Sequence, residues 1–168
     1  MIKIGDIVFV QTKGICELKG IEKNAFEGCD KNKEYYILKP VESSSNMVIY
    51  FPTDTKVSIR KLSSKQAVDK ILKNIKDFPE IDVKTEEDRL KIYGETASKG
   101  ELSSWMSLLK TLAKRKKTIS KKQFSFQEQR YFNIMLACVV DEISYIISKS
   151  KDEVKSMILD EFELSDEK

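Results

Sequence analysis

The spacing of apolar residues changes near residue 62, and this change limits the possible folds of the 168-residue chain more than any other feature. Before residue 62, short apolar runs alternate with turn-forming residues, a pattern typical of β-strands. After it, apolar residues recur every three or four positions, which is typical of amphipathic helices. We therefore predict an α+β protein with a β domain over residues 1–62 and a helical domain over residues 63–168.

Five short strands are expected in the β domain. The apolar runs that predict them are residues 7–10, 15–21, 35–38, 47–51 and 57–59. The fourth run is closed by Pro52, because proline has no N–H group to donate to a β-ladder. Short strands separated by turn signals predict a small, strongly bent sheet or barrel.

The starts of four helices are marked by capping signals. In a capping box, a Ser or Thr hydroxyl accepts from the backbone three residues on, where a polar side chain reaches back. The pattern occurs at Ser63 with Gln66, Thr85 with Asp88, Ser125 with Glu128 and Ser150 with Glu153. A further helix follows Gly100, so about five helices are expected, and Pro79 is expected to end the first of them.

The residue types available to the chain argue against catalysis. It contains no histidine, which excludes histidine-based triads and general bases and zinc sites with histidine ligands. Acidic residues 86–88 and 141–142 occupy adjacent helical positions that point in different directions. A Mg²⁺ site at residues 86–88 stays open, but acids at a helix start are also favoured by the helix dipole. We expect no enzyme activity, no cofactor and no small-molecule substrate.

The cysteines and the apolar runs indicate the cellular compartment. Cys16, Cys29 and Cys138 are widely spaced and odd in number, unlike a secreted disulfide framework. We expect free thiols, with no disulfide and no zinc. The longest apolar run, residues 134–140, is far too short to cross a bilayer, and the N-terminus lacks a signal-peptide pattern. A cytoplasmic protein without a membrane partner is therefore expected.

Positive charge is concentrated in one segment. The net charge is +3, but residues 63–149 hold seventeen basic and twelve acidic residues. Seven of these cations lie between residues 110 and 122 with no acid among them: Lys110, Lys114, Arg115, Lys116, Lys117, Lys121 and Lys122. Such a run fits a phosphate-binding surface. It equally fits a solvated helix end, where cations are favoured by the helix dipole.

The chain opens with Ile4-Gly5-Asp6-Ile7-Val8-Phe9-Val10, then Lys13-Gly14-Ile15-Cys16, then Gly20-Ile21-Glu22. In this order the segments resemble the start of the CarD/CdnL family of bacterial transcription regulators, which reads roughly G-D-x-V-V-Y, then H-G, then a strand ending in I-E. Further similar segments are residues 34–39, 99–102, 112–115, 124–129 and 158–161. Each motif is short, so the resemblance depends on their shared order along nearly the whole chain.

This resemblance implies a Tudor-like, SH3-like β-barrel that binds the RNA polymerase β subunit, followed by a helical domain that contacts promoter DNA. It implies a regulator without catalysis, associated with the nucleoid through polymerase. Such a protein would modulate open-complex stability by binding one state of the polymerase–promoter complex better than another. The barrel also resembles the polymerase-interacting domain of the transcription–repair coupling factor, which leaves open a protein-only interaction module with little DNA binding.

The resemblance places polymerase contacts on the fourth strand and an earlier hairpin. Arginines that grip polymerase in well-known members align here with Tyr50 and Asn24. We expect the fourth strand to lie at the sheet edge and to add to a strand of polymerase. The expected polymerase-binding residues are Asn24, Met47, Val48, Ile49, Tyr50 and Phe51.

The resemblance also places DNA contacts on the helical domain. In many members a tryptophan near the start of the second helix enters the minor groove, but the aligned residue here is Glu86. The only tryptophan, Trp105, lies on an apolar stripe and is expected in the core. DNA binding is therefore expected to be weak and limited to phosphates. The expected DNA-binding residues are Arg89, Lys91, Lys114, Arg115, Lys116, Lys117, Lys121 and Lys122.

Overall fold

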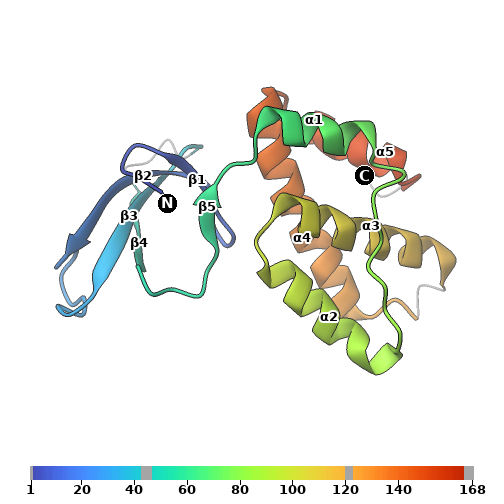
Figure 1. The fold of residues 1–168 in the computed structure, drawn as a ribbon, viewed down its shortest axis with the longest axis horizontal. Coiled ribbons are helices and arrows are strands. Elements are labelled where there is room, and N and C mark those ends of the chain that lie inside the picture. Colours follow the sequence, from blue (N-terminus) through green and yellow to red (C-terminus); the bar gives the residue numbers. More distant parts are fainter. Residues whose placement is uncertain (1, 43–46, 120–122, 165–168) are drawn as a thin grey trace. The chain divides into compact units, whose positions relative to one another are not determined.

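The chain folds into two compact units, Met1–Leu62 and Ser63–Lys168 (Figure 1). The structure is a computed structural model that describes residues 2–42, 47–119 and 123–164. An antiparallel sheet comes first and five helices follow, so the predicted α+β class is confirmed.

The first unit is a five-stranded antiparallel sheet. Its strands are β1 (Ile7–Val10), β2 (Gly14–Lys23), β3 (Glu34–Pro40), β4 (Ile49–Pro52) and β5 (Ile59–Lys61), in the spatial order β4-β3-β2-β1-β5. One face carries a core of fully buried side chains: Val8, Val10, Cys16, Leu18 and Leu38. Val8 and Val10 of β1 are two residues apart, as are Cys16 and Leu18 of β2, so the members of each pair point to the same face of the sheet.

Two strands begin two residues later than predicted. β4 begins at Ile49, so Met47 and Val48 precede it, and Val57 precedes β5. The β3–β4 ladder stops at the pair Leu38–Ile49 because Pro40 is the next residue of β3 that faces β4, and proline has no N–H group. The N–H of Val57 is held locally by the hydroxyl of Thr55 at 3.2 Å.

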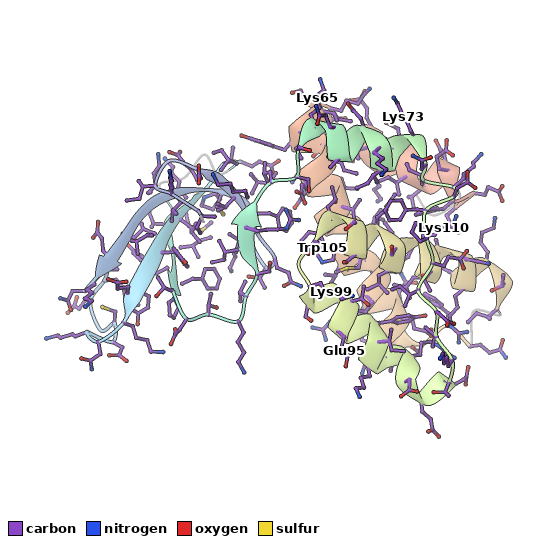
Figure 2. All side chains as sticks on the ribbon, viewed as in Figure 1. Lys65, Lys73, Glu95, Lys99, Trp105 and Lys110 are labelled. Carbon is purple, nitrogen blue, oxygen red and sulfur yellow. The ribbon has the colours of Figure 1, made fainter. Side chains whose placement is uncertain are left out.

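The second unit is organised around its longest helix. The helices are α1 (Lys65–Lys73), α2 (Glu86–Ser98), α3 (Leu102–Thr118), α4 (Phe126–Ile147) and α5 (Lys151–Glu161), and α4 packs against each of the other four. Trp105 of α3 is fully buried, and its indole N–H donates to the carbonyl of Ala97 at 2.9 Å (Figure 2). Its predicted place in the core is confirmed.

Local capping explains most helix starts. Complete capping boxes form at Ser125 with Glu128 and at Ser150 with Glu153, and Thr85 caps α2. The first helix differs from the prediction, because Ser64 rather than Ser63 is its cap. The N–H of Ser63 instead donates to the buried carboxylate of Glu142 at 2.7 Å.

The first helix also ends earlier than Pro79. It stops at Lys73, where the side-chain amide of Asn74 donates to the carbonyl of Lys70 at 2.7 Å. Such a side-chain bond competes with the helical backbone pattern. Among the helices of the described ranges, none alone has the length and hydrophobicity of a membrane span; α4 and α5 pass that test only as a pair, with a bend of 119° between them.

The three cysteines differ in accessibility, and this predicts their reactivity. Cys16 and Cys138 are buried, whereas Cys29 is partly exposed. Burial raises the pKa of the Cys16 thiol to about 11. The thiolate is the reactive form, so Cys16 is protected both by access and by protonation.

A chromogenic thiol reagent at pH 8 should therefore react quickly with one thiol of the native protein and with three thiols in denaturant. The Cys29→Ser variant should lose the fast reaction. Fast reaction of two or three thiols in the native wild type would show that Cys16 or Cys138 is not protected as the structure describes. Three thiols titrated in denaturant without reductant would also agree with the expectation of no disulfide.

Candidate functional site

β4 forms one of the two edges of the sheet, as expected, and β5 forms the other. Thr53 follows β4, and its N–H donates to the carbonyl of Glu34, the first residue of β3, at 2.9 Å. The main chain of Thr53 is therefore directed toward β3. Because alternate residues of a strand point their main-chain groups to opposite sides, Ile49 and Phe51 face β3 and Tyr50 faces away from it. The N–H and C=O groups of Tyr50 are therefore directed outward from the sheet edge.

The side chains of β4 divide between the two faces of the sheet. Ile49 and Phe51 pack against the buried core, whereas Tyr50 lies on the opposite face and is 37% exposed. The ring of Phe26 lies 4.9 Å from the ring of Tyr50, measured between centroids, and 5.3 Å from that of Tyr35. Phe26 is itself exposed. The edge strand is thus bordered by an apolar surface.

We call this surface the β4 edge surface and define it as Phe26, Met47, Val48 and Tyr50, all of which are exposed. Sequence reasoning missed Phe26; an aromatic residue within the otherwise polar loop between β2 and β3 is the signal that could have identified it. Asn24, an expected contact, follows the last residue of β2 and has a φ of 53°. Asn adopts this left-handed conformation more readily than most residues, so Asn24 also has a role in the turn.

Two of the expected DNA-binding residues meet at a buried carboxylate. Arg115 Nε of α3 donates to Glu128 Oε1 of α4 at 2.6 Å, and Arg89 Nη1 of α2 lies 3.6 Å from the same oxygen. The side chains of Arg89 and Arg115 are only 14% and 22% exposed. Glu86 forms an ion pair with Arg89, and its Oε1 lies 3.7 Å from Arg115 Nη2. We call Glu86, Arg89, Arg115 and Glu128 the arginine cluster.

Glu128 has two roles at once. Its Oε2 accepts from the N–H of Ser125 at 2.8 Å in the capping box, while its Oε1 receives the arginines. Burial alone would raise the pKa of Glu128, but the hydrogen bonds from Ser125 and Arg115 outweigh it and hold this pKa below its ordinary value. Sequence reasoning identified the capping role only, because nothing local predicts that two arginines from other helices converge there.

The lysines of the basic run also meet acids in the folded chain. Lys114 Nζ lies 3.1 Å from Glu80, and Lys117 pairs with Glu163. Lys116 Nζ lies 4.9 Å from the centre of the Phe132 ring, within the range of a cation–π contact. The run has no acid in the sequence, yet the tertiary structure brings acids to it from the segment after α1 and from the residues that follow α5.

The other expected residues lie apart from the arginine cluster or outside the description. Lys91 is exposed on α2. Lys121 and Lys122 lie outside the described residues. Within the described ranges, no group of three or more His, Cys, Asp or Glu side chains is placed to hold a metal ion. Glu86 and Asp88 of the acidic helix start are bound to Arg89 and Thr85, respectively.

The geometry predicts that Glu128 stabilises the helical unit. In Glu128→Gln, Arg89 and Arg115 lose a buried counter-charge, and the free energy of unfolding should fall by about 2 kcal/mol, the range for hydrogen bonds to charged groups. Urea unfolding followed by fluorescence measures this directly, because Trp105, the chain's only tryptophan, lies in this unit.

Glu153→Gln is the matched control, because Glu153 completes the same kind of capping box without an arginine. Its effect should be much smaller. Since the pKa of Glu128 is lowered in the folded state, its stabilisation is present above about pH 4.3, the ordinary pKa of glutamate, and is lost as the pH falls further. The stability difference between wild type and Glu128→Gln should shrink over that range, and equal losses in both variants would contradict the proposed role of the arginines.

The first unit is similar to a known family of domains. Residues 2–63 match the family model of the CarD-like/TRCF RID domain. The chain matched no curated protein sequence. Domains of this family are RNA polymerase-interacting modules with a Tudor-like fold. The first unit, with its β4 edge, is therefore similar to the CarD-like/TRCF RID domain, and the resemblance of this chain to the CarD-like family is confirmed over residues 2–63.

Proposed function

We propose that the chain is a non-catalytic transcription regulator that binds the RNA polymerase β subunit through β4 and modulates open-complex stability. The observation that carries the proposal is an exposed edge strand in a domain of a polymerase-interacting family. A protein of this kind changes an equilibrium only by binding one state of the polymerase–promoter complex more tightly than another. It would act in the cytoplasm, at the nucleoid.

The edge of β4 is suited to pairing with another strand. Exposed edges are commonly protected by charged side chains, since unpaired N–H and C=O groups invite other strands. β4 reads Ile49-Tyr50-Phe51-Pro52 and carries no charge. The outward main-chain groups of Tyr50 supply hydrogen-bonding capacity, and the adjoining rings of Tyr50 and Phe26 supply apolar contact. Strand addition combines these two contributions, the first to affinity and the second to specificity.

Contact with promoter DNA would come from the exposed amino groups of α3. Lys114 and Lys117 have side chains that are well exposed, and their ion pairs with Glu80 and Glu163 are the surface type that contributes little free energy. A phosphate can therefore compete for these lysines. The resulting binding would be weak and independent of base sequence, with dissociation constants near the upper end of the usual non-specific range of about 10⁻⁴ to 10⁻⁶ M.

A protein-only interaction module is the second candidate. The acids that lie beside the basic run favour it, since Glu80, Glu128 and Glu163 neutralise charges that phosphates would otherwise meet. In that case the helical unit would serve another purpose, and only the β4 edge would bind polymerase.

Tyr50→Glu should abolish binding to the isolated β subunit while leaving the melting temperature nearly unchanged. The added carboxylate would have to be desolvated beside the partner strand, which is unfavourable without a counter-charge. Tyr145→Glu is the matched control, because Tyr145 is 40% exposed but lies on α4 of the helical unit. Binding measured by surface plasmon resonance should be lost only in the first variant; retention of wild-type affinity in Tyr50→Glu would rule out this interface.

Replacing Lys114, Lys116 and Lys117 with Gln should weaken binding to all DNA sequences by a similar factor. The slope of log affinity against log salt concentration should also become less steep, by about 0.9 for each phosphate that the variant no longer binds. Arg115 is left intact because it holds Glu128. The control replaces Lys65, Lys70 and Lys73 on α1, which removes the same charge elsewhere in the unit (Figure 2). Equal DNA binding by wild type and the α3 variant would favour the protein-only candidate.

A further inference from the structure

The arginine cluster separates two surface cavities of the helical unit. One cavity, of about 430 Å³, is bordered by the segment after α1, and the other, of about 440 Å³, by the end of α3 and the start of α4. Three residues line both cavities: Glu86, Arg89 and Arg115. The guanidinium groups are therefore partly shielded from solvent and yet reachable from an open surface.

The two carboxylates of the cluster are held very differently. Glu128 is buried, and both of its oxygens are engaged, one by Ser125 and the other by the arginines. Glu86 is 82% exposed, and its carboxylate pairs with Arg89 and lies close to Arg115. The carboxylate of Glu128 is thus a fixed part of the structure, whereas the carboxylate of Glu86 lies on the solvent-exposed side of the two arginines.

We propose that Arg89 and Arg115 form a binding site for a single phosphate group and that the carboxylate of Glu86 occupies this site in the free protein. The Nη2 atoms of both arginines lie near the same oxygen of Glu86, at 3.7 Å in the case of Arg115, and this oxygen marks where a phosphate oxygen would sit. Guanidinium groups bind phosphate through several N–H donors in a fixed geometry. Glu128 neutralises one of the two positive charges, so one charge remains for an external anion once Glu86 moves away.

Both cavities give access to the two arginines. Apart from Glu86 and Glu128, none of the described residues lining the 440 Å³ cavity is acidic, and Ser125 and Gln123 add polar groups. The other cavity is lined by Glu80 and Asp82 but also by Lys84 and Lys114, so a phosphate could approach from either side. We assign the phosphate to a nucleic-acid backbone, and this source rests on the proposed function. Glu86 would then set how strongly the helical unit binds DNA.

The test compares Glu86→Gln with Glu87→Gln in the full chain. Both variants remove one negative charge from neighbouring positions of α2, but Glu87 is not part of the arginine cluster. Two ligands are titrated separately: inorganic phosphate, followed through the arginine Nε–Hε signals in NMR spectra, and a forked DNA fragment, followed by fluorescence anisotropy over a range of salt concentrations.

Glu86→Gln should bind both ligands about two- to fivefold more tightly than wild type, which is the effect of removing an exposed ion pair. For DNA, the slope of log affinity against log salt concentration should become steeper by about 0.9, the change expected for one additional bound phosphate. Glu87→Gln should stay close to wild type. Equal changes in the two variants with both ligands would overturn the site, whether or not DNA binds.

A tighter affinity specific to Glu86→Gln with inorganic phosphate but not with DNA would support the phosphate site and count against the proposed DNA contact. A tighter affinity for DNA alone, without any change in the Arg89 and Arg115 signals, would overturn the site, because the effect would then arise elsewhere. Melting temperatures close to that of wild type would confirm that both variants are folded.

Discussion

The carboxylate of Glu128 is the interaction on which the arrangement of the helical unit depends. It caps its own helix through Ser125 and binds Arg115 of α3 and Arg89 of α2, so three helices meet at one side chain. A buried charge is costly unless it is paired and hydrogen-bonded. Glu128 satisfies this condition only when α2 and α3 lie where the structure has them, which couples local capping to tertiary packing.

The same interaction determines what the basic segment can do. A run of cations without acids would be a simple phosphate-binding surface. In the folded chain, Arg115 is committed to Glu128, while Lys114 and Lys117 face Glu80 and Glu163. Exposed ion pairs of this kind are weak and exchange readily, whereas the buried pair does not. Anion binding is therefore left to the lysines and to the outer side of the two arginines.

In the β unit, a single proline has a comparable influence. Pro40 ends the ladder between β3 and β4, so β4 is short and Met47 and Val48 precede it. What remains is an uncharged edge whose outward main-chain groups belong to Tyr50. Pro52 closes the strand at its other end. The edge that is available to a partner strand is therefore short and lies next to Tyr50 and Phe26.

Much of the fold could be predicted because its signals are local. The change of apolar period, the capping boxes at Ser125 and Ser150 and the buried stripe of Trp105 each depend on residues a few positions apart. One error involves a group that is distant in the sequence. Ser64 rather than Ser63 caps α1, and the N–H of Ser63 donates instead to Glu142.

The sequence by itself determined which segments become strands and helices, because hydrophobic period and capping act within one or two turns of chain. It also determined the family resemblance of residues 2–63, because short motifs in a fixed order can be recognised without knowing which residues are in contact. Only the tertiary structure decided the partners of Arg89, Arg115 and Lys117, and that Phe26 lies against Tyr50. Charges and rings act through space, so their partners are decided by packing rather than by position in the chain.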